Sequence, residues 1–288
     1  MKFYIVDAFT EELFGGNPAG VVLLGNADYP EDSLMVKTAA ELRYSETAFV
    51  KKLGDKHFRA RYFTPAAEVD LCGHATIALS GVLMEEGEVT RDDSFVLETM
   101  AGTLNVEIND GFIFMDMGKP ESLGEIEDKA DVERLAKIMG TSYENVICKP
   151  ELVSTGLPDI MLGLASEEAL NSLKPDFEAL AAYSKEKEVV GVHAYCLDSG
   201  KDVTARCRNF APLYDIDEEA ATGTSNGALT YHLYKKGQIK EGQANVFIQG
   251  EAMDRPSKIM SRLTLKDGGE LIQVGGVYKP LAKGEINL

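Results

Sequence analysis

The chain has 288 residues, of which 29 are Lys or Arg and 47 are Asp or Glu, giving a formal net charge of −18. This surplus of negative charge would repel a polyanion, so we predict no nucleic-acid partner and no binding to an anionic membrane. Hydrophobic residues make up 44% and charged residues 26%, which is typical of a globular protein of one large domain or two smaller ones.

Targeting and cysteine patterns indicate the compartment. No apolar run approaches the roughly 18 residues of a membrane span, and the N-terminal stretch reaches Asp7 without a signal-peptide core. The four cysteines are far apart and form no C-x-x-C pair: Cys72, Cys148, Cys196 and Cys207. We therefore expect a cytoplasmic protein with reduced cysteines and no structural zinc.

The first half of the chain predicts short strands around one buried helix. Residues 33–42 predict a helix, and residues 47–50 and 57–63 predict two strands joined by a turn at 53–56. Residues 73–86 predict a second helix that ends at Gly87, a residue suited to the position after a helix. This helix is apolar nearly all round, so strands should surround it. Further strands are predicted at residues 94–97, 103–108 and 112–117.

The second half repeats this pattern after a polar segment. Residues 121–142 are polar, and we interpret their start as a linker. Residues 170–187 predict one amphipathic helix that matches residues 33–42 of the first half. We expect one domain over 1–120, completed by a C-terminal strand near 281–288, and a second domain over 121–280.

Internal similarity supports a duplication. Arg59, Arg61, Phe63 and Pro65 recur 147 residues later, and Gly73–Gly87 recurs 150 residues later as Gly223–Gly237. Gly16-Asn17-Pro18 also resembles Gly156-Leu157-Pro158, 140 residues later. Several matches in the same order indicate that each half is a copy of one unit. The repeated arginines are interpreted as structural ion-pair partners rather than as substrate clamps.

Both copies begin a buried helix with glycine, at Gly73-His74-Ala75 and at Gly223-Thr224-Ser225. A helix N-terminus attracts anions, and glycine allows a ligand to approach the backbone. We therefore predict that the two helix starts face one crevice and hold a small carboxylate. No nucleotide-binding glycine motif occurs, and the four histidines show no metal-ligand spacing, so no cofactor and no metal are expected.

Several motifs together resemble the PhzF family, which is named for phenazine biosynthesis. They are Asp7-Ala8-Phe9-Thr10, Gly16-Asn17-Pro18, Ser45-Glu46-Thr47, Phe63-Thr64-Pro65 and Leu71-Cys72-Gly73-His74-Ala75-Thr76. The resemblance covers essentially the whole chain. It implies an α+β, diaminopimelate-epimerase-like fold of two pseudo-symmetric domains, each a β-barrel around a central helix. It also implies a cofactor-free isomerase that is commonly a homodimer.

The resemblance assigns roles to individual residues. It implies that Glu46 is the general acid/base, that His74 lines the pocket, and that Glu219 and Thr224 replace the family's aspartate and serine. Gly73, Ala75, Gly223 and Ser225 complete the predicted substrate site. Because Glu219 is longer than aspartate, the substrate of the phenazine enzyme does not carry over.

The predicted function is isomerisation of a small carboxylate by proton abstraction and return. Glu46 suits this role if burial raises its pKa toward neutrality. The alternative enzyme class is an amino-acid racemase or epimerase that uses Cys72, but the position of its second thiol is occupied by Ala220. A further alternative is a catalytically inactive binder of small metabolites.

Overall fold

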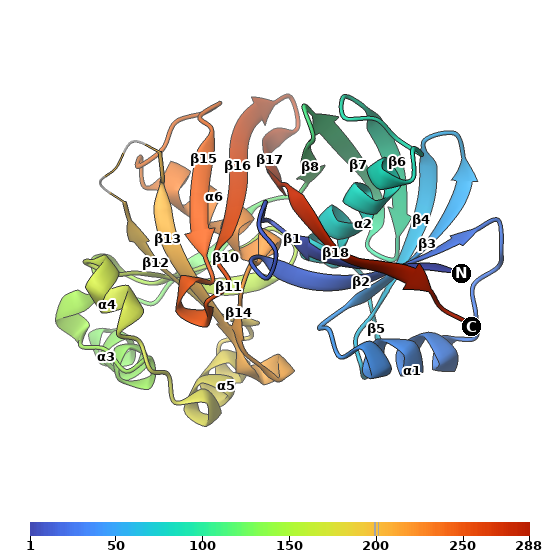
Figure 1. The fold of residues 1–288 in the computed structure, drawn as a ribbon. Helices are drawn as coiled ribbons and strands as arrows, with labels where there is room; N and C mark the ends of the chain where they lie inside the picture. Colours follow the sequence, from blue (N-terminus) through green and yellow to red (C-terminus); the bar gives the residue numbers. More distant parts are fainter. Residues whose placement is uncertain (199, 201) are drawn as a thin grey trace. The chain divides into compact units, whose positions relative to one another are not determined.

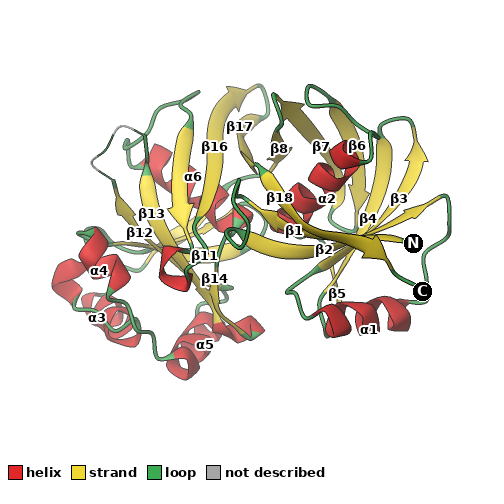
Figure 2. Ribbon diagram, in the orientation of Figure 1, coloured by secondary structure: helices red, strands yellow, loops and turns green. Residues whose placement is uncertain are grey.

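The computed structural model describes residues 1–198, 200 and 202–288. The chain forms two compact units, one made of Met1–Asp116 with Gly275–Leu288 and the other of Met117–Val274. The sequence places the two boundaries a few residues later, at 120 and 280. Both units have a mixed α/β fold in which strands outnumber helices, as Figures 1 and 2 show.

The first unit is an extended ladder of strands with two helices. Along the ladder the paired strands follow the order β18, β1, β2, β3, β4, β6, β7 and β8, and β5 pairs with β4. The bounds are β1 Lys2–Ala8, β2 Asn17–Gly25, α1 Asp32–Leu42, β3 Thr47–Gly54, β4 His57–Phe63, β5 Glu68–Val69, α2 Gly73–Glu85, β6 Ser94–Thr99, β7 Gly102–Asn109, β8 Phe112–Asp116 and β18 Tyr278–Glu285.

Helix α2 is the core of the first unit. Every residue from His74 to Leu83 is buried, and the helix packs against β1, β2, β3, β8 and β18. The predicted end is confirmed: Gly87 has φ +74°, and the N–H of Glu88 donates to the carbonyl of Leu83 at 2.9 Å. The predicted all-round burial of this helix is therefore confirmed.

The described part of the second unit has a similar ladder and four helices. Its paired strands follow the order β9, β10, β11, β12, β13, β15 and β16, and β14 pairs with β13. The bounds are β9 Glu121–Glu125, α3 Lys129–Ile138, β10 Glu151–Ser154, β11 Pro158–Gly163, α4 Glu167–Asn171, α5 Phe177–Glu186, β12 Gly191–Leu197, β13 Ala205–Ala211, β14 Ile216–Glu219, α6 Gly223–Lys235, β15 Asn245–Gln249, β16 Ser257–Lys266 and β17 Gly269–Gly276; 3-10 turns span Tyr143–Asn145, Pro212–Tyr214 and Glu251–Met253.

Helices of the second unit occupy two different environments. Helix α6 is buried from Ser225 to Leu233 and packs against β10, β11 and β16. Helices α3, α4 and α5 lie together beside β12 and β13 (Figure 2). Their apolar faces form a separate core with residues such as Leu135, Leu180 and Phe210.

Strand directions confirm the duplication. β2 pairs with β3 in parallel and β11 pairs with β12 in parallel, and the same holds for β4 with β6 and β13 with β15. The register also repeats, because Arg59 is opposite Glu98 and Arg206 is opposite Ile248. Arg206 lies 147 residues after Arg59, and Ile248 lies 150 residues after Glu98, which are the two offsets that separate the sequence repeats. The two units therefore share one topology.

Two predicted elements differ from the structure. Residues 170–187 do not form one helix but belong to α4 and α5, separated at Pro175, because proline cannot continue a helix and disfavours a helical residue before it. The carboxylate of Asp176 then starts α5 by accepting from the N–H of Ala179 at 3.1 Å. The expected linker at residue 121 is instead β9, which pairs with β10.

Among the described residues, every helix is too short or too polar to cross a bilayer.

Candidate functional site

Glu46 and His74 form a buried pair in the first unit. Glu46 precedes β3, and His74 is the second residue of α2, so the strand start and the helix start bring them together. Their side chains are 14% and 4% exposed, and Oε2 of Glu46 lies 3.2 Å from Nε2 of His74. No well-oriented hydrogen bond within the described part of the chain reaches this oxygen. This buried carboxylate oxygen thus lies beside a ring nitrogen and keeps part of its hydrogen-bonding capacity free.

The remaining contacts of His74 fix the ring in place. Nδ1 lies 3.2 Å from the side-chain nitrogen of Asn17 at the start of β2, and 3.4 Å from Sγ of Cys72. Nε2 lies 3.3 Å from Oγ of Ser45. A side-chain amide can present its oxygen or its nitrogen, so Asn17 can pair with either protonation state of the ring. Three different elements therefore orient His74.

The charges of this pair differ from the prediction. Burial alone raises the pKa of Glu46, but the close approach and positive charge of His74 outweigh it and hold that pKa below its ordinary value. Burial lowers the pKa of His74, whereas Cys72 and Glu46 raise it well above the ordinary value. The pair is therefore a carboxylate and an imidazolium. The expected elevation of the Glu46 pKa toward neutrality is wrong for the ligand-free site, because a cation accompanies the burial.

The pKa of Cys72 shifts in the opposite direction to that of Glu46. It is 7% exposed, and burial, with the nearby charge of Glu46, raises the pKa of its thiol to about 11 despite its contact with His74. The thiol is therefore protonated at neutral pH. A helix N-terminus favours a thiolate, but here desolvation is the larger effect.

Glu46, Cys72 and His74 also have the geometry of a possible metal site. One ligand atom from each lies within 4.8 Å of the others, a spacing that oxygen, sulfur and nitrogen ligands of zinc can adopt. The sequence does not reveal this cluster, because its three members come from separate motifs and show no metal-ligand spacing. Metal independence therefore stays a prediction that needs an experiment.

The start of α2 supplies the backbone part of the site. Cys72 occupies the N-cap position and makes no side-chain cap, and Gly73 is only partly buried whereas Ala75 is fully buried. First-turn N–H groups carry the positive end of the helix dipole. Gly73 is therefore the point of this turn that a substrate anion can approach.

The corresponding helix start in the second unit is held by a network that the sequence did not predict. The hydroxyl of Thr222 donates to the carboxylate of Glu219. The amide of Gln249 donates to the carbonyl of Glu219 at 2.7 Å and accepts from Asn226 at 2.8 Å. Gln249 lies at the end of β15 in no recognisable motif, so only the fold brings it to this helix.

Three predicted ligands at this helix start differ in exposure. Gly223 is buried and Thr224 is partly exposed. Ser225 is 1% exposed, and its hydroxyl donates to Oδ2 of Asp159 at 2.5 Å. Of these side chains, Thr224 is therefore the one that can reach a ligand, and Ser225 positions the helix start through Asp159.

Glu46 has no carboxylate counterpart at the matching position of the second unit. The residue that corresponds to Glu46 in the repeat is His193, which is 0% exposed and pairs with Asn209 at 3.0 Å. Burial lowers its pKa to about 4, so the ring is neutral. Of the two residues at this repeated position, Glu46 is therefore the one that carries a carboxylate.

The repeated arginines are structural, as predicted. Arg61 makes a two-fold hydrogen bond with Glu68, and Arg208 makes the same bond with Glu218, 147 and 150 residues further on. Other pairs are Arg59 with Glu98 and Arg206 with Glu251. These guanidinium groups are engaged by carboxylates, so they do not serve as substrate clamps.

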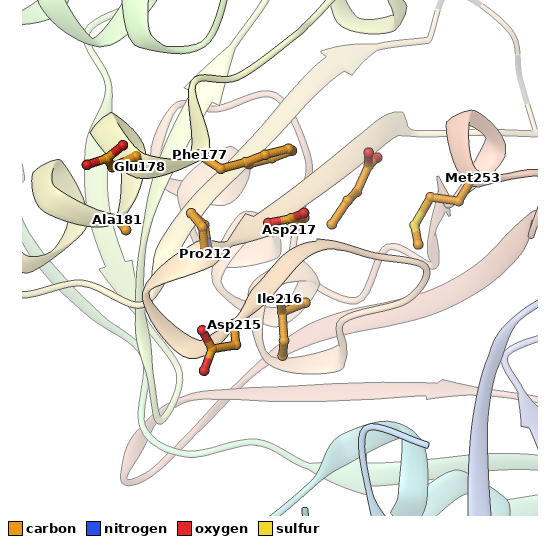
Figure 3. Close-up of a pocket in the computed structure, with 9 residues that line it drawn as sticks. Phe177, Glu178, Ala181, Pro212, Asp215, Ile216, Asp217 and Met253 are labelled. Carbon is orange, nitrogen blue, oxygen red and sulfur yellow. The ribbon is translucent and has the colours of Figure 1, made fainter. Parts of the chain in front are cut away.

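A pocket of about 650 Å³ in the second unit is lined by none of the predicted site residues, although its lining includes Glu218, the neighbour of Glu219 on β14. As Figure 3 shows, Phe177, Ala181, Ile216 and Met253 line it together with acidic side chains. The acidic lining residues are Glu178, Asp215, Asp217 and Glu218. Carboxylates would repel a carboxylate substrate, so this pocket is not the candidate site.

Comparisons with known proteins identify the class. The chain is 37% identical to an uncharacterized isomerase of Clostridium acetobutylicum over 241 residues, covering 81% of this chain and 78% of the relative. It is 30% identical to the trans-2,3-dihydro-3-hydroxyanthranilate isomerase of Pseudomonas aeruginosa, covering 100% and 99%. The protein is therefore an isomerase.

The family follows from a match along nearly the whole chain. The model of the PhzC-PhzF family, described as phenazine biosynthesis-like protein, matches residues 6–279. The crystal structure of a PhzF-family phenazine biosynthesis protein of Bacillus anthracis superposes with a TM-score of 0.88 at 26% identity, covering 100% of this chain and 99% of that one. The chain belongs to the PhzC-PhzF family.

Proposed function

We propose that this isomerase moves a proton within a small carboxylate substrate and that Glu46 takes and returns that proton. The observation that carries the proposal is the Oε2 atom of Glu46, which is buried, lies 3.2 Å from His74 and lacks a well-oriented hydrogen bond in the described part of the chain. A general base must present such an unused oxygen to the substrate.

The ion pair with His74 explains how the cycle can close. In the resting site Glu46 is ionised and can accept a proton, and the imidazolium can hold the substrate carboxylate. A bound anion partly neutralises the imidazolium and thereby raises the pKa of Glu46, which makes the carboxylate a better base. The same carboxyl group then returns the proton to another carbon.

Backbone and neighbouring groups complete the proposed machinery. The N–H groups at Gly73 and Ala75 in α2, and at Gly223 in α6, stabilise the carboxylate or a developing enolate-like oxygen. Glu219 and Thr224 supply hydrogen-bonding groups that fix the substrate. The strands of each unit are proposed to close into a barrel around α2 or α6, which would keep water from the chemistry. That both helix starts face one crevice remains a prediction.

Replacement of Glu46 tests the proposal. The assay follows solvent-deuterium uptake by NMR for a panel of small amino and hydroxy carboxylates that starts with trans-2,3-dihydro-3-hydroxyanthranilate. We expect Glu46→Gln to lower kcat at least about 10²-fold, because general acid/base assistance contributes about 10²–10⁴-fold. Cys72→Ser should cost much less, and the exposed control Glu41→Gln on α1 should leave turnover unchanged.

Other outcomes assign another function. A larger loss for Cys72→Ser than for Glu46→Gln, with inversion at an α-carbon, would assign the racemase reaction instead. Ligand binding without solvent exchange in a folded protein would support the binder. Activity lost with EDTA and restored by a divalent ion would move Glu46, Cys72 and His74 from acid/base chemistry to metal ligation. Undiminished turnover of folded Glu46→Gln would rule out the proposal.

A further inference from the structure

A second cluster of chemically active side chains lies in the second unit at the C-terminal end of α6. Its central residue is His232, which is 0% exposed and lies nine residues after Gly223, the first residue of the helix. Nδ1 of His232 lies 2.7 Å from Oε2 of Glu151 on β10. Oε1 of the same carboxylate accepts from the hydroxyl of Ser122 at 2.5 Å. The carboxylate thus fixes the orientation of the imidazole.

The other ring nitrogen leads to a cysteine. Nε2 of His232 lies 2.9 Å from the phenol oxygen of Tyr195 on β12, which lies 3.7 Å from Sγ of Cys148. A Cβ at Gly163 would stand 2.9 Å from the phenol oxygen, so the glycine on β11 makes room for this arrangement.

The charges in the cluster favour a thiolate. Burial raises the pKa of Glu151, but the hydrogen bonds of His232 and Ser122 hold it at about 2. Burial lowers the pKa of His232, but Cys148 and Glu151 raise it above its ordinary value. Nζ of Lys236, one turn further along α6, adds a positive charge 3.7 Å from Oε2 of Glu151. Burial raises the pKa of Cys148, yet His232 and Tyr195 bring it below that of an ordinary thiol.

Cys148 differs from the other three cysteines in exposure and in the direction of its pKa shift, the two properties that determine thiol reactivity. Cys72, Cys196 and Cys207 are buried, and burial raises the pKa of each thiol. Cys148 lies in a loop between α3 and β10 and is partly exposed. A thiolate at the surface is the nucleophilic form of cysteine, whereas a buried thiol is inert.

We propose that Cys148 is an activated thiol and the site at which this protein is oxidised by small hydroperoxides. The thiolate sulfur attacks one peroxide oxygen, so an S–O bond forms while the O–O bond breaks. The sulfur is oxidised to a sulfenic acid and the peroxide is reduced. The leaving hydroxide, or the alkoxide of an organic hydroperoxide, takes the phenol proton of Tyr195, the His232 imidazolium returns a proton to Tyr195, and water or an alcohol departs.

Glu151, His232, Tyr195 and Cys148 form a relay in which each residue has a separate role. Glu151 holds His232 protonated, in the way a carboxylate orients the imidazole of a catalytic triad. Tyr195 bridges the imidazole and the sulfur. The sequence gives no sign of this set, because Cys148, Glu151, Tyr195 and His232 are brought together from four separate elements or loops.

Alkylation and oxidation of the full chain test the proposal. The rate of carbamidomethylation by iodoacetamide is measured from pH 5 to 10, with mass spectrometry to locate the modified cysteine. We expect Cys148 to react first, with a midpoint below the roughly 8.5 of a free thiol. After hydrogen peroxide, dimedone should label Cys148 and leave the other three cysteines unlabelled, and Cys148→Ser should abolish the labelling.

Two variants separate the relay from general electrostatics. Glu151→Gln should slow alkylation at pH 7 by about tenfold for each unit by which the thiol pKa rises. Glu127→Gln removes the same charge near Lys149 without touching the relay and should leave the rate unchanged. Tyr195→Phe, which removes only the hydroxyl, should slow peroxide oxidation more than alkylation, because iodide leaves without a proton.

The following results would overturn the proposal. One is a wild-type midpoint at or above that of a free thiol. Another is dimedone labelling spread equally over the four cysteines, and a third is an equal effect of Glu151→Gln and Glu127→Gln. If Glu151→Gln does not fold, the wild-type profile and Tyr195→Phe decide the matter. Deuterium exchange at the substrate is a separate readout, so failure here leaves the role of Glu46 untouched.

Discussion

Asp159 is a buried carboxylate that the sequence gives no reason to single out. It lies on β11, is 2% exposed and accepts the hydroxyl of Ser225. Burial raises its pKa to about 6, although Ser225 and the N–H of Gly191 lower it. The folded protein therefore holds this proton at pH values where the unfolded chain, with an ordinary pKa of 3.8, has released it. Stability must fall as pH rises through this window.

Asp159→Asn should remove this pH dependence, because an amide accepts from Ser225 and does not ionise. A shift of about two units corresponds to about 3 kcal/mol. We therefore expect the unfolding free energy of Asp159→Asn, relative to wild type, to increase by about 2–3 kcal/mol between pH 4 and 7.5. Urea denaturation across this range measures it. The exposed control Asp217→Asn should show no such trend, and a constant difference for Asp159→Asn would contradict the interpretation.

At the scale of elements, the two central helices match in sequence, but each has an internal glycine at a position where the other has a larger residue. A Cβ at Gly81 of α2 would stand 2.3 Å from the ring of Tyr278 on β18. A Cβ at Gly227 of α6 would stand 3.1 Å from the Thr155 hydroxyl oxygen and 3.3 Å from side-chain carbons of Met117 and Val274, contacts that a small shift of these side chains can relieve. The ring of Tyr278 is also tied down, because its hydroxyl donates to Glu85 at 3.0 Å. Strand β18 therefore packs directly onto the backbone of α2.

Gly81→Ala should destabilise the protein, although alanine favours a helix by about 1 kcal/mol over glycine. Overpacking a close contact costs about 1–3 kcal/mol, and Tyr278 cannot withdraw without losing its hydrogen bond. Gly227→Ala is the matched control, and there the two effects should nearly cancel. Differential scanning calorimetry of both variants gives the comparison. A melting temperature of Gly81→Ala at or above that of Gly227→Ala would show that β18 yields easily.

At the scale of the whole molecule, the surplus of acidic residues governs association. Each chain carries a net charge of −18, so two copies repel each other at low ionic strength. The family resemblance nevertheless leads us to propose a homodimer. Hydrophobic side chains must then supply the contact, because the surplus charge opposes it.

Light scattering should give twice the chain mass of 31.4 kDa, and the dimer should resist dilution better in 0.15 M salt than in 0.01 M salt. Screening shortens the reach of the repulsion from about 30 Å to about 8 Å over this range. Repetition with potassium chloride in place of sodium chloride separates screening from binding of a particular ion. A monomer at every salt concentration would refute the homodimer, and dissociation by salt would indicate an interface built on ion pairs.

The sequence by itself determined the duplication, the two central helices and the family. These features are local or repeated: an apolar helix that must be buried, a glycine after its end, and arginines that return at constant spacing. It also placed Glu46 and His74 in motifs whose chemistry is recognisable. Such signals survive in a linear chain because each depends on neighbouring residues or on comparison of one half with the other.

The hydrogen-bond partners and the pKa values of the site residues depend on the tertiary structure. Asn17 meets His74, and Gln249 meets the start of α6, through contacts between residues that are distant in the sequence. The pKa of Glu46 is set by the imidazolium beside it as well as by burial, and Cys148 is activated by residues up to 84 positions away. Electrostatic energy depends on the distance between charges in space and on the solvent excluded around them. Neither quantity can be obtained from the order of residues, and both follow once the strands have brought the side chains together.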